Sequence, residues 1–255
     1  MNNILERDEM KECLRNFLIN FESNKHTSQI KRGVYVYGAT GSGKTCFVKS
    51  ILQELEYDII SYDAGDIRNK GAMDAITNNK MSDRNVMSMF HRKVKNIAIV
   101  MDEIDGLNQG DKGGINALIK LVREKKTKKQ RLEEVTFNPI ICIGNYHIDK
   151  KIKELMKVCV TIELKPPTNE QMMNITKQII PRLDDNVYTQ LCNFAQNDLH
   201  KLSQLYMLYI KDNTFNSETL ETICHLKSYN DDAKNITKSL INKPHIFEDH
   251  NKIMN

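Results

Sequence analysis

The sequence predicts an α/β fold, in which a five-stranded parallel sheet is flanked by helices and followed by a small all-helical lid. Five short runs rich in β-branched residues alternate with helical patterns up to residue 165. The segments between these runs are long enough for crossover helices, as a parallel sheet covered on both faces requires. The predicted strands are residues 33–37, 58–62, 97–101, 139–143 and 160–164.

The chain changes character at Pro166-Pro167, where two prolines stop any regular element. Thr168 and Gln171 then have the spacing of a capping box, which opens a helix. From there to about residue 242 only helical periodicity is found. Its apolar positions are Met172, Ile175, Ile179 and Ile180, then Val187, Leu191, Phe194 and Ala195, and then Leu199, Leu202, Leu205, Tyr206 and Tyr209.

Residues 38–45 read Gly-Ala-Thr-Gly-Ser-Gly-Lys-Thr, which is a complete phosphate-binding loop. In a chain of this length the pattern arises by chance on the order of 1% of the time at average residue usage. The loop lies between a predicted strand and a predicted helix, so that backbone N–H groups and the positive helix end point at the β- and γ-phosphates. The alternative is a glycine-rich surface loop without a ligand.

The side chains of this loop predict that a nucleoside triphosphate binds together with Mg²⁺. Lys44 adds a positive charge near the phosphates, and the hydroxyl group of Thr45 can hold Mg²⁺. The expected nucleotide contacts are Gly38, Ala39, Thr40, Gly41, Ser42, Gly43, Lys44, Thr45 and Cys46.

The predicted strand 97–101 ends in two carboxylates, Asp102 and Glu103. A buried strand ends in paired acids only at a cost, unless a cation or hydrogen-bond donors meet them. Ligands of open α/β sheets lie at the carboxyl ends of the strands, so Asp102 is expected beside the phosphate loop. There Asp102 would complete the Mg²⁺ shell with Thr45, and Glu103 would polarise the attacking water. Alternatively, the acids only start a helix or turn.

The predicted strand 139–143 is followed by Gly144 and Asn145. If this strand lies between the other two, the Asn145 amide can hydrogen-bond the water or the γ-phosphate. The expected catalytic residues are therefore Lys44, Glu103 and Asn145. A plain Gly-Asn turn is the alternative.

Composition indicates an intracellular protein. The 255 residues are 40% hydrophobic and carry a net charge of +4, which permits a polyanionic partner without demanding one. No apolar stretch approaches the roughly 20 residues that cross a bilayer, and no signal peptide is evident, so no membrane partner is expected. Six scattered cysteines predict reduced, mostly buried thiols. The expected compartment is nuclear or cytoplasmic, and the Asn-, Ile- and Lys-rich composition also fits a viral replication compartment.

Residues 123–131 form the basic segment of the chain, with six lysines and arginines. Charge runs of this kind usually form solvated loops. A contact to nucleic-acid phosphates is the second interpretation.

The chain resembles the AAA+ ATPases, and among them the large subunits of the clamp loader replication factor C. The resemblance rests on residues 63–70 (Asp-Ala-Gly-Asp-Ile-Arg-Asn-Lys), 101–107 (Met-Asp-Glu-Ile-Asp-Gly-Leu), 111–115 (Asp-Lys-Gly-Gly-Ile) and 142–145 (Cys-Ile-Gly-Asn). It implies a P-loop AAA+ module and an ATPase that places a sliding clamp on primer–template DNA during DNA replication.

The resemblance also implies residues that contact partners. Basic residues and helix N-termini after the second and third strands would follow the DNA backbone without reading its sequence. These residues are Arg68, Lys70, Lys112, Gly113 and Gly114. The residues matching the segment that enters a hydrophobic pocket of the clamp are Val86, Met89 and Phe90, for which an ordinary apolar helix face is the alternative.

Two departures from the family pattern concern catalysis. Residues 157–159 read Lys-Val-Cys where the small subunits carry a Ser-Arg-Cys arginine finger, so this chain is expected to receive a finger in trans from another subunit. Alone, it should hydrolyse ATP slowly. In the lid, His200 stands where the family has a sensor arginine; it is either a phosphate contact or an exposed helix histidine.

We therefore expect residues 1–165 to form the AAA+ nucleotide-binding α/β domain and residues 166–228 the helical lid. Residues 229–255 would be a tail or the start of the family's collar domain, for which they are too short. The resemblance favours an ATP-hydrolysing clamp-loader subunit. The alternatives are a nucleotide-dependent scaffold with negligible turnover, or another AAA+ DNA protein such as a replication initiator or checkpoint loader.

Overall fold

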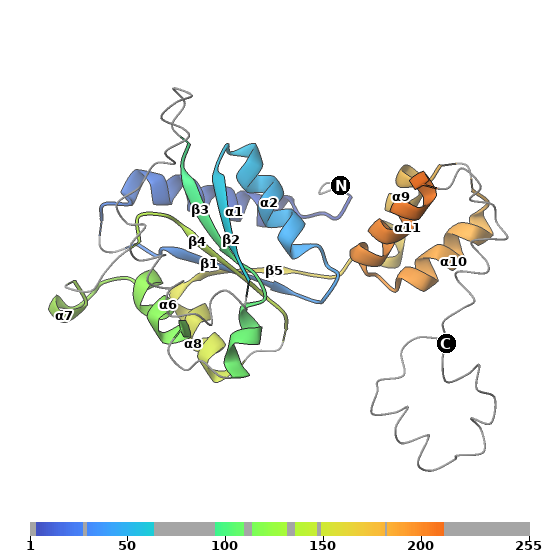
Figure 1. Cartoon of the computed structure of the whole chain (residues 1–255). Helices are drawn as coiled ribbons and strands as arrows, with labels where there is room; N and C mark the ends of the chain where they lie inside the picture. The colour runs from blue at the N-terminus through green and yellow to red at the C-terminus, as the bar shows by residue number, and fades with distance from the viewer. Residues whose placement is uncertain are drawn as a thin grey trace, which may run out of the picture. The chain divides into compact units, whose positions relative to one another are not determined.

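A computed structural model of the chain describes residues 4–27, 30–63, 95–109, 114–131, 136–146, 149–181 and 183–211 (Figure 1). The contacts between residues divide the chain into two units. The first is Met1–Thr168 together with Asp198–His200, and the second is Asn169–Asn197 together with Lys201–Asn255.

The first unit contains the predicted five-stranded parallel sheet. Its strands are β1 (Gly33–Gly38), β2 (Asp58–Tyr62), β3 (Ile97–Met101), β4 (Ile140–Gly144) and β5 (Val160–Leu164). Their order is β2-β3-β4-β1-β5, and every pairing is parallel. The predicted fold class is thus confirmed; β1 ends one residue later than predicted, and β4 is shifted by one residue. Since β4 lies between β3 and β1, three carboxyl ends that carry candidate residues are neighbours.

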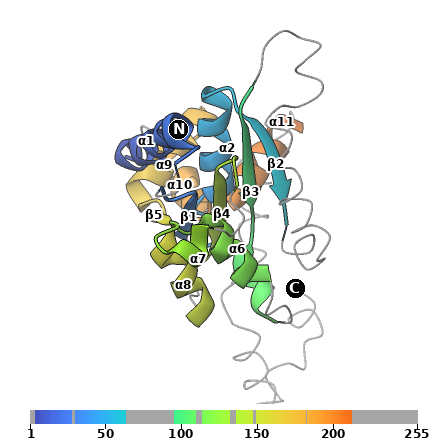
Figure 2. The same ribbon diagram turned by 90° about the vertical axis from the view of Figure 1, so that its left-hand side faces the viewer.

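Helices cover both faces of the sheet (Figures 1 and 2). They are α1 (Asp8–Asn24), α2 (Lys44–Glu54), α6 (Gly114–Val122), α7 (Lys128–Arg131) and α8 (Lys150–Val158), and a 3₁₀ helix, η2 (Ile104–Gln109), follows β3. Alternate strand residues face opposite layers. Val34 and Val36 pack with the apolar sides of α1 and α2, whereas Tyr35 packs with those of α6 and α8.

The second unit is helical in its described part. It contains α9 (Asn169–Ile179), α10 (Asp185–Ala195) and most of α11 (Leu199–Lys211). Val187 and Leu191 of α10 pack against Leu205 of α11, as the periodicity predicts. The Tyr188 hydroxyl group donates to the carbonyl oxygen of Ile180 at 2.7 Å, which ties α10 to the end of α9.

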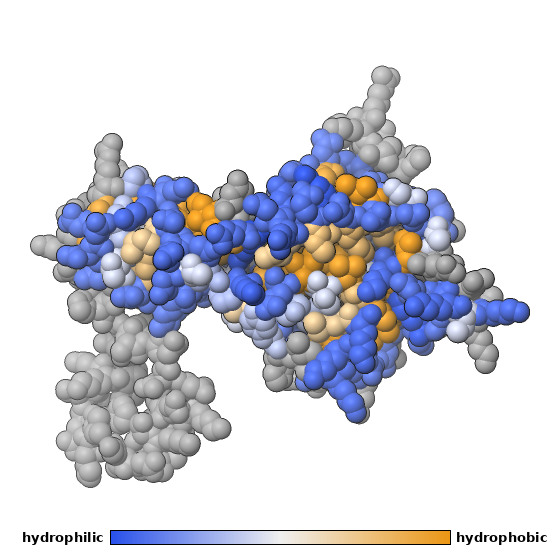
Figure 3. Space-filling view, turned by 180° about the vertical axis from the view of Figure 1, so that it is seen from behind, coloured by the Kyte–Doolittle hydropathy of each residue, from blue (hydrophilic) through white to orange (hydrophobic). Residues whose placement is uncertain are grey.

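The surface is not uniformly polar. In the view of Figure 3, hydrophobic residues gather in the middle of the larger unit and hydrophilic residues surround them. None of the described helices is both long and apolar enough to cross a membrane.

The cysteine expectation is wrong in part. All five cysteines of the described ranges are free, and Cys142 and Cys159 are buried in the sheet layers as expected. Cys13 and Cys46 are exposed, because they lie on the solvent-facing sides of α1 and α2.

Candidate active site

The phosphate loop joins the end of β1 to the start of α2. Gly41 and Gly43 have φ angles of 73° and 80°, a backbone conformation that favours glycine. Space also requires glycine, since a Cβ atom on Gly41 would lie 2.2 Å from Cγ of Asp198, and one on Gly38 would lie 2.2 Å from the carbonyl oxygen of Leu164. The loop conformation therefore follows from the glycine spacing in the sequence.

Lys44 lies half-buried at the first position of α2. Its Nζ atom donates to the carbonyl oxygens of Gly38 at 3.1 Å and Ala39 at 2.8 Å, and to Oδ1 of Asn145 at 3.0 Å. Burial lowers the pKa of Lys44, while the nearby charges of Asp105 and Asp102 oppose this shift. The ammonium group is thus held over the loop by three oxygen atoms.

Thr45 and Asp102 meet across the gap between α2 and the end of β3. The hydroxyl group of Thr45 donates to Oδ2 of Asp102 at 2.8 Å. Two hard oxygen donors at this separation suit Mg²⁺, which takes one or two protein oxygens and completes its shell with water and phosphate. The described ranges contain no cluster of three or more His, Cys, Asp or Glu side chains that could hold a metal without such help.

Glu103 has a φ angle of 52°, which is uncommon for a residue with a side chain and marks local backbone strain. Its backbone N–H donates to Oδ1 of Asp102 at 3.0 Å, and its side chain is exposed. The N–H of Asp102 in turn donates to the carbonyl oxygen of Tyr62 at 2.9 Å, which extends the sheet to this point. The structure therefore places Asp102 in the hydrogen-bonded site and leaves the side chain of Glu103 exposed.

Asn145 directly follows β4 and meets two charged side chains. Besides accepting from Lys44, its side-chain nitrogen donates to Oδ2 of Asp105 at 2.9 Å. The parallel pairing of Tyr37 with Gly144 brings Asn145 beside the phosphate loop. The structure thus joins Lys44, Thr45, Asp102 and Asn145 in one site, and adds Asp105.

Sequence reasoning gave no role to Asp105 or to Arg7. Arg7, which precedes α1, is only 3% exposed, and its Nη2 atom donates to the carbonyl oxygens of Ser42 at 2.8 Å and Lys165 at 3.2 Å. Burial lowers the pKa of Arg7. The sequence offers no signal for this contact, because nothing in the polar N-terminal segment distinguishes Arg7 from other surface arginines.

The phosphate loop is also contacted by the segment Asp198–His200, which is distant in sequence but belongs to the first unit. The N–H of Leu199 donates to the carbonyl oxygen of Gly41 at 2.8 Å, and the N–H of His200 donates to Oδ1 of Asp198 at 2.7 Å. The His200 side chain is exposed, so its phosphate-contact role stays a prediction. Asp198 and Leu199 make the contacts described here.

Most of the predicted partner contacts lie outside the described residues. These are Arg68, Lys70, Lys112 and Gly113 for DNA and Val86, Met89 and Phe90 for the clamp. Gly114 is described: it is the buried first residue of α6. Cys46 is exposed on the first turn of α2.

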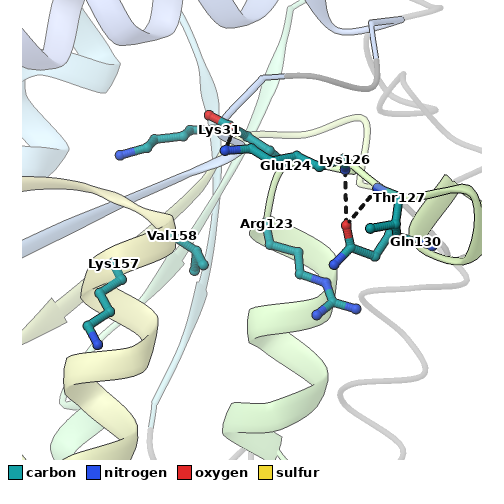
Figure 4. A pocket seen from close by; sticks show the side chains of 8 residues that line it. All are labelled: Lys31, Arg123, Glu124, Lys126, Thr127, Gln130, Lys157 and Val158. Atoms are coloured by element: carbon teal, nitrogen blue, oxygen red, sulfur yellow. Dashed lines mark hydrogen bonds and ion pairs between the residues drawn. The ribbon is translucent and has the colours of Figure 1, made fainter.

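Part of the basic segment lines a hollow of about 490 Å³ at the edge where the strands begin, away from the phosphate loop (Figure 4). Lys31 comes from the segment before β1, Arg123 directly follows α6, and Lys157 comes from the end of α8. Lys126 also lines the hollow and pairs with Glu124 at 3.0 Å. Lys125 is buried and its Nζ atom donates to the carbonyl oxygen of Lys120, so the segment is not entirely a solvated loop.

Comparison with known families identifies the larger unit. Residues 34–166, just over half of the chain, match the model of the "ATPase family associated with various cellular activities (AAA)". The chain belongs to the AAA family of ATPases. The match begins in β1 and ends just after β5, so it spans the sheet and the site described above.

Similar AAA proteins include subunits of replication factor C. The chain is 28% identical over 251 residues to replication factor C subunit 1 of Saccharomyces cerevisiae, covering 91% of this chain and 27% of the relative. It is 26% identical over 204 residues to the replication factor C large subunit of Nanoarchaeum equitans, covering 78% of this chain and 43% of the relative. The chain therefore spans less than half the length of these relatives.

Solved structures show the same fold at lower identity. The Thermotoga maritima RuvB Holliday junction branch migration motor matches with a TM-score of 0.58 at 15% identity, covering 89% of this chain and 74% of that one. Caenorhabditis elegans PCH-2 matches with a TM-score of 0.56 at 15% identity, covering 86% and 66%. These likenesses concern the fold alone.

Proposed function

We propose that this AAA protein is the ATP-binding and ATP-hydrolysing subunit of a clamp-loader-like complex, which loads a sliding clamp onto primer–template DNA during DNA replication. The observation that carries the ATPase part is the hydrogen-bonded set Lys44–Asn145 and Thr45–Asp102 at a phosphate loop. The similarity to large subunits of replication factor C supports the clamp-loading part.

Each residue of the site has one role in the proposed reaction. Loop N–H groups and Lys44 would bind the β- and γ-phosphates. Thr45 and Asp102 would hold Mg²⁺, which would supply positive charge to the phosphate oxygens. Glu103 accepts a proton from the attacking water. Asn145 donates an N–H to that water or to the γ-phosphate and so senses its presence.

The proposal gives the partner subunits a share of catalysis. Residues 157–159 read Lys-Val-Cys, so Val158 stands where the Ser-Arg-Cys pattern has its finger arginine, and we infer that another subunit supplies this cation in trans. Such a finger typically raises the rate by roughly 10³–10⁵, so the chain alone should turn over slowly. Arg68, Lys70, Lys112, Gly113 and Gly114 are the proposed DNA contacts, and Val86, Met89 and Phe90 the proposed clamp contacts.

The test measures steady-state ATP hydrolysis by the full chain, alone and then with primer–template DNA, a sliding clamp and candidate partner subunits. We expect stimulation that Glu103→Gln abolishes while ATP binding persists, because only the proton acceptor is lost. Lys44→Ala should abolish binding itself.

Asp185→Asn is the matched control, since the same chemical change is made at a carboxylate whose side chain is 87% exposed. Unchanged binding in Lys44→Ala would contradict the nucleotide site. Tight binding without turnover in any combination would instead favour a nucleotide-dependent scaffold.

A further inference from the structure

Two buried oxygen atoms beside the site have no hydrogen-bond partner within the described part of the chain. They are the Tyr35 hydroxyl oxygen and Oδ1 of Asp105. Both approach one point, because a Cβ atom on Gly144 would lie 2.2 Å from the Tyr35 hydroxyl oxygen and 3.3 Å from Oδ1 of Asp105. Tyr35 is fully buried in the middle of β1. Buried polar atoms left unpaired are costly, so this arrangement calls for an explanation.

The second oxygen of Asp105 is fully engaged with Asn145. Oδ2 accepts from the side-chain nitrogen of Asn145 at 2.9 Å and from its backbone N–H at 3.4 Å. An ionised carboxylate only accepts hydrogen bonds, and a lysine ammonium only donates them. The amide of Asn145 therefore has one allowed orientation, with its nitrogen toward Asp105 and its oxygen toward Lys44. Among the described residues, the second N–H of the amide has no partner and could donate to a ligand.

The negative charge of Asp105 also affects the pKa values of Lys44 and Tyr35. It opposes the burial-induced lowering of the Lys44 pKa more strongly than Asp102 does. Burial raises the pKa of Tyr35, and the charge of Asp105 raises it further, so the hydroxyl group stays protonated and able to donate.

We propose that Asp105 is a positioning residue, which fixes the Asn145 amide for the γ-phosphate. We propose also that the Tyr35 hydroxyl group, which lies near Oδ1 of Asp105 without bonding to it in this structure, donates to that oxygen once a nucleotide is bound. This inference rests on the proposed binding of ATP at Lys44. When Lys44 turns from the oxygens of Gly38, Ala39 and Asn145 toward phosphate, Asn145 loses one of its two fixed partners. Asp105 is the partner that then keeps the amide in place.

The consequence is selectivity between nucleotides. The Asn145 amide is already held in place by Asp105, so it can donate to a γ-phosphate without losing further conformational freedom. ADP has no γ-phosphate and gains nothing from this arrangement. Removing Asp105 should therefore weaken the binding of a triphosphate and leave the binding of ADP unchanged. The expected loss is about tenfold, which is typical of one hydrogen bond to a charged group.

The experiment measures the dissociation constants of Mg²⁺ complexes of ADP and of the non-hydrolysable β,γ-imido analogue of ATP, using the full chain. In Asp105→Ala we expect the preference for the triphosphate to fall about tenfold. Asp105→Asn keeps one acceptor oxygen, so its preference for the triphosphate should fall by a smaller factor. In Tyr35→Phe the preference should fall by a still smaller factor. The double variant Asn145→Ala with Asp105→Ala should show the same preference for the triphosphate as Asn145→Ala alone, because either change removes the same interaction.

Asp185→Asn again serves as the control for the loss of a carboxylate. If Asp105→Ala prefers the triphosphate over ADP as strongly as the wild type does, the inference is overturned. Should Asp105→Ala not fold, a wild-type preference in both Asp105→Asn and Tyr35→Phe would overturn it equally. If the wild-type chain binds neither nucleotide, the proposed function fails, and this outcome is distinct from the others.

Discussion

A single buried guanidinium group braces the phosphate loop from outside. Arg7 links the carbonyl oxygen of Ser42 in the loop to that of Lys165 just after β5. Both oxygens accept from a charged donor, and such bonds are stronger than neutral ones. Arg7 therefore connects the start of the chain, the loop and the end of the sheet at one point.

Replacing Arg7 by Ala should lower the free energy of unfolding of the first unit by about 2 kcal/mol, because two charge-assisted hydrogen bonds are lost in a buried place. It should also weaken ATP binding, since the loop loses its support. Thermal unfolding followed by circular dichroism and nucleotide titration measure the two effects.

Arg15 on α1 provides the control, because its ion pair with Glu54 is partly exposed, with 30% and 44% of the two side chains accessible. Arg15→Ala should cost no more than about 1 kcal/mol, as surface pairs do. Equal effects of the two substitutions would contradict the bracing role of Arg7.

Among the elements, the phosphate loop and the Asp198–His200 segment depend on each other. Gly41 must be glycine both for its φ angle and because the carboxyl group of Asp198 occupies the place of a side chain. Gln196 and Asn197 also have positive φ angles, 50° and 61°, so the chain turns sharply just before it meets the loop.

Gly41→Ala should weaken ATP binding at least tenfold, and adding Asp198→Ala should restore part of that loss. The second change removes the atoms that a Cβ on Gly41 would meet and leaves only the backbone strain, about 1–2 kcal/mol. A double-mutant cycle of nucleotide dissociation constants, with Asp198→Ala alone as the third variant, measures this coupling. Strict additivity of the two changes would argue against the steric contact.

The predictable part of the molecule is the part that local patterns determine. Runs of β-branched residues gave all five strands, and the loop motif located Lys44 and Thr45, which the structure joins to Asn145 and Asp102. Asp105 and Arg7 escaped prediction because their partners are distant in sequence and are met only through the folded sheet. The exposure of Cys13 and Cys46 was misjudged because helical periodicity alone does not say which face a small residue takes.

For the whole molecule, the mild positive charge of +4 means that the proposed DNA binding would depend on local groups of cations. Simultaneous Arg68→Ala and Lys70→Ala changes should weaken DNA binding about equally for all sequences. They should also reduce the slope of log affinity against log salt by roughly two units if both contact duplex phosphates. Fluorescence anisotropy with two unrelated primer–template duplexes at several salt concentrations measures both quantities.

The control is the double variant Lys126→Ala with Lys128→Ala, which also removes two positive charges. These residues lie in the basic segment, away from the phosphate loop. An unchanged slope there indicates a solvated segment, and a reduced slope indicates a second phosphate contact. An unchanged slope in the Arg68 and Lys70 variant would refute their proposed role.

The exposed thiol of Cys46 follows Thr45 directly on the first turn of α2, whereas that of Cys13 lies on α1. The reactivity of the Cys46 thiol should therefore report on the phosphate loop, and the Cys13 thiol can serve as an internal reference in the same chain. Occupancy of the loop should slow alkylation of the first sulfur and leave the second at its original rate. Mass spectrometry of the unmodified wild-type protein can then follow nucleotide loading without any engineered label.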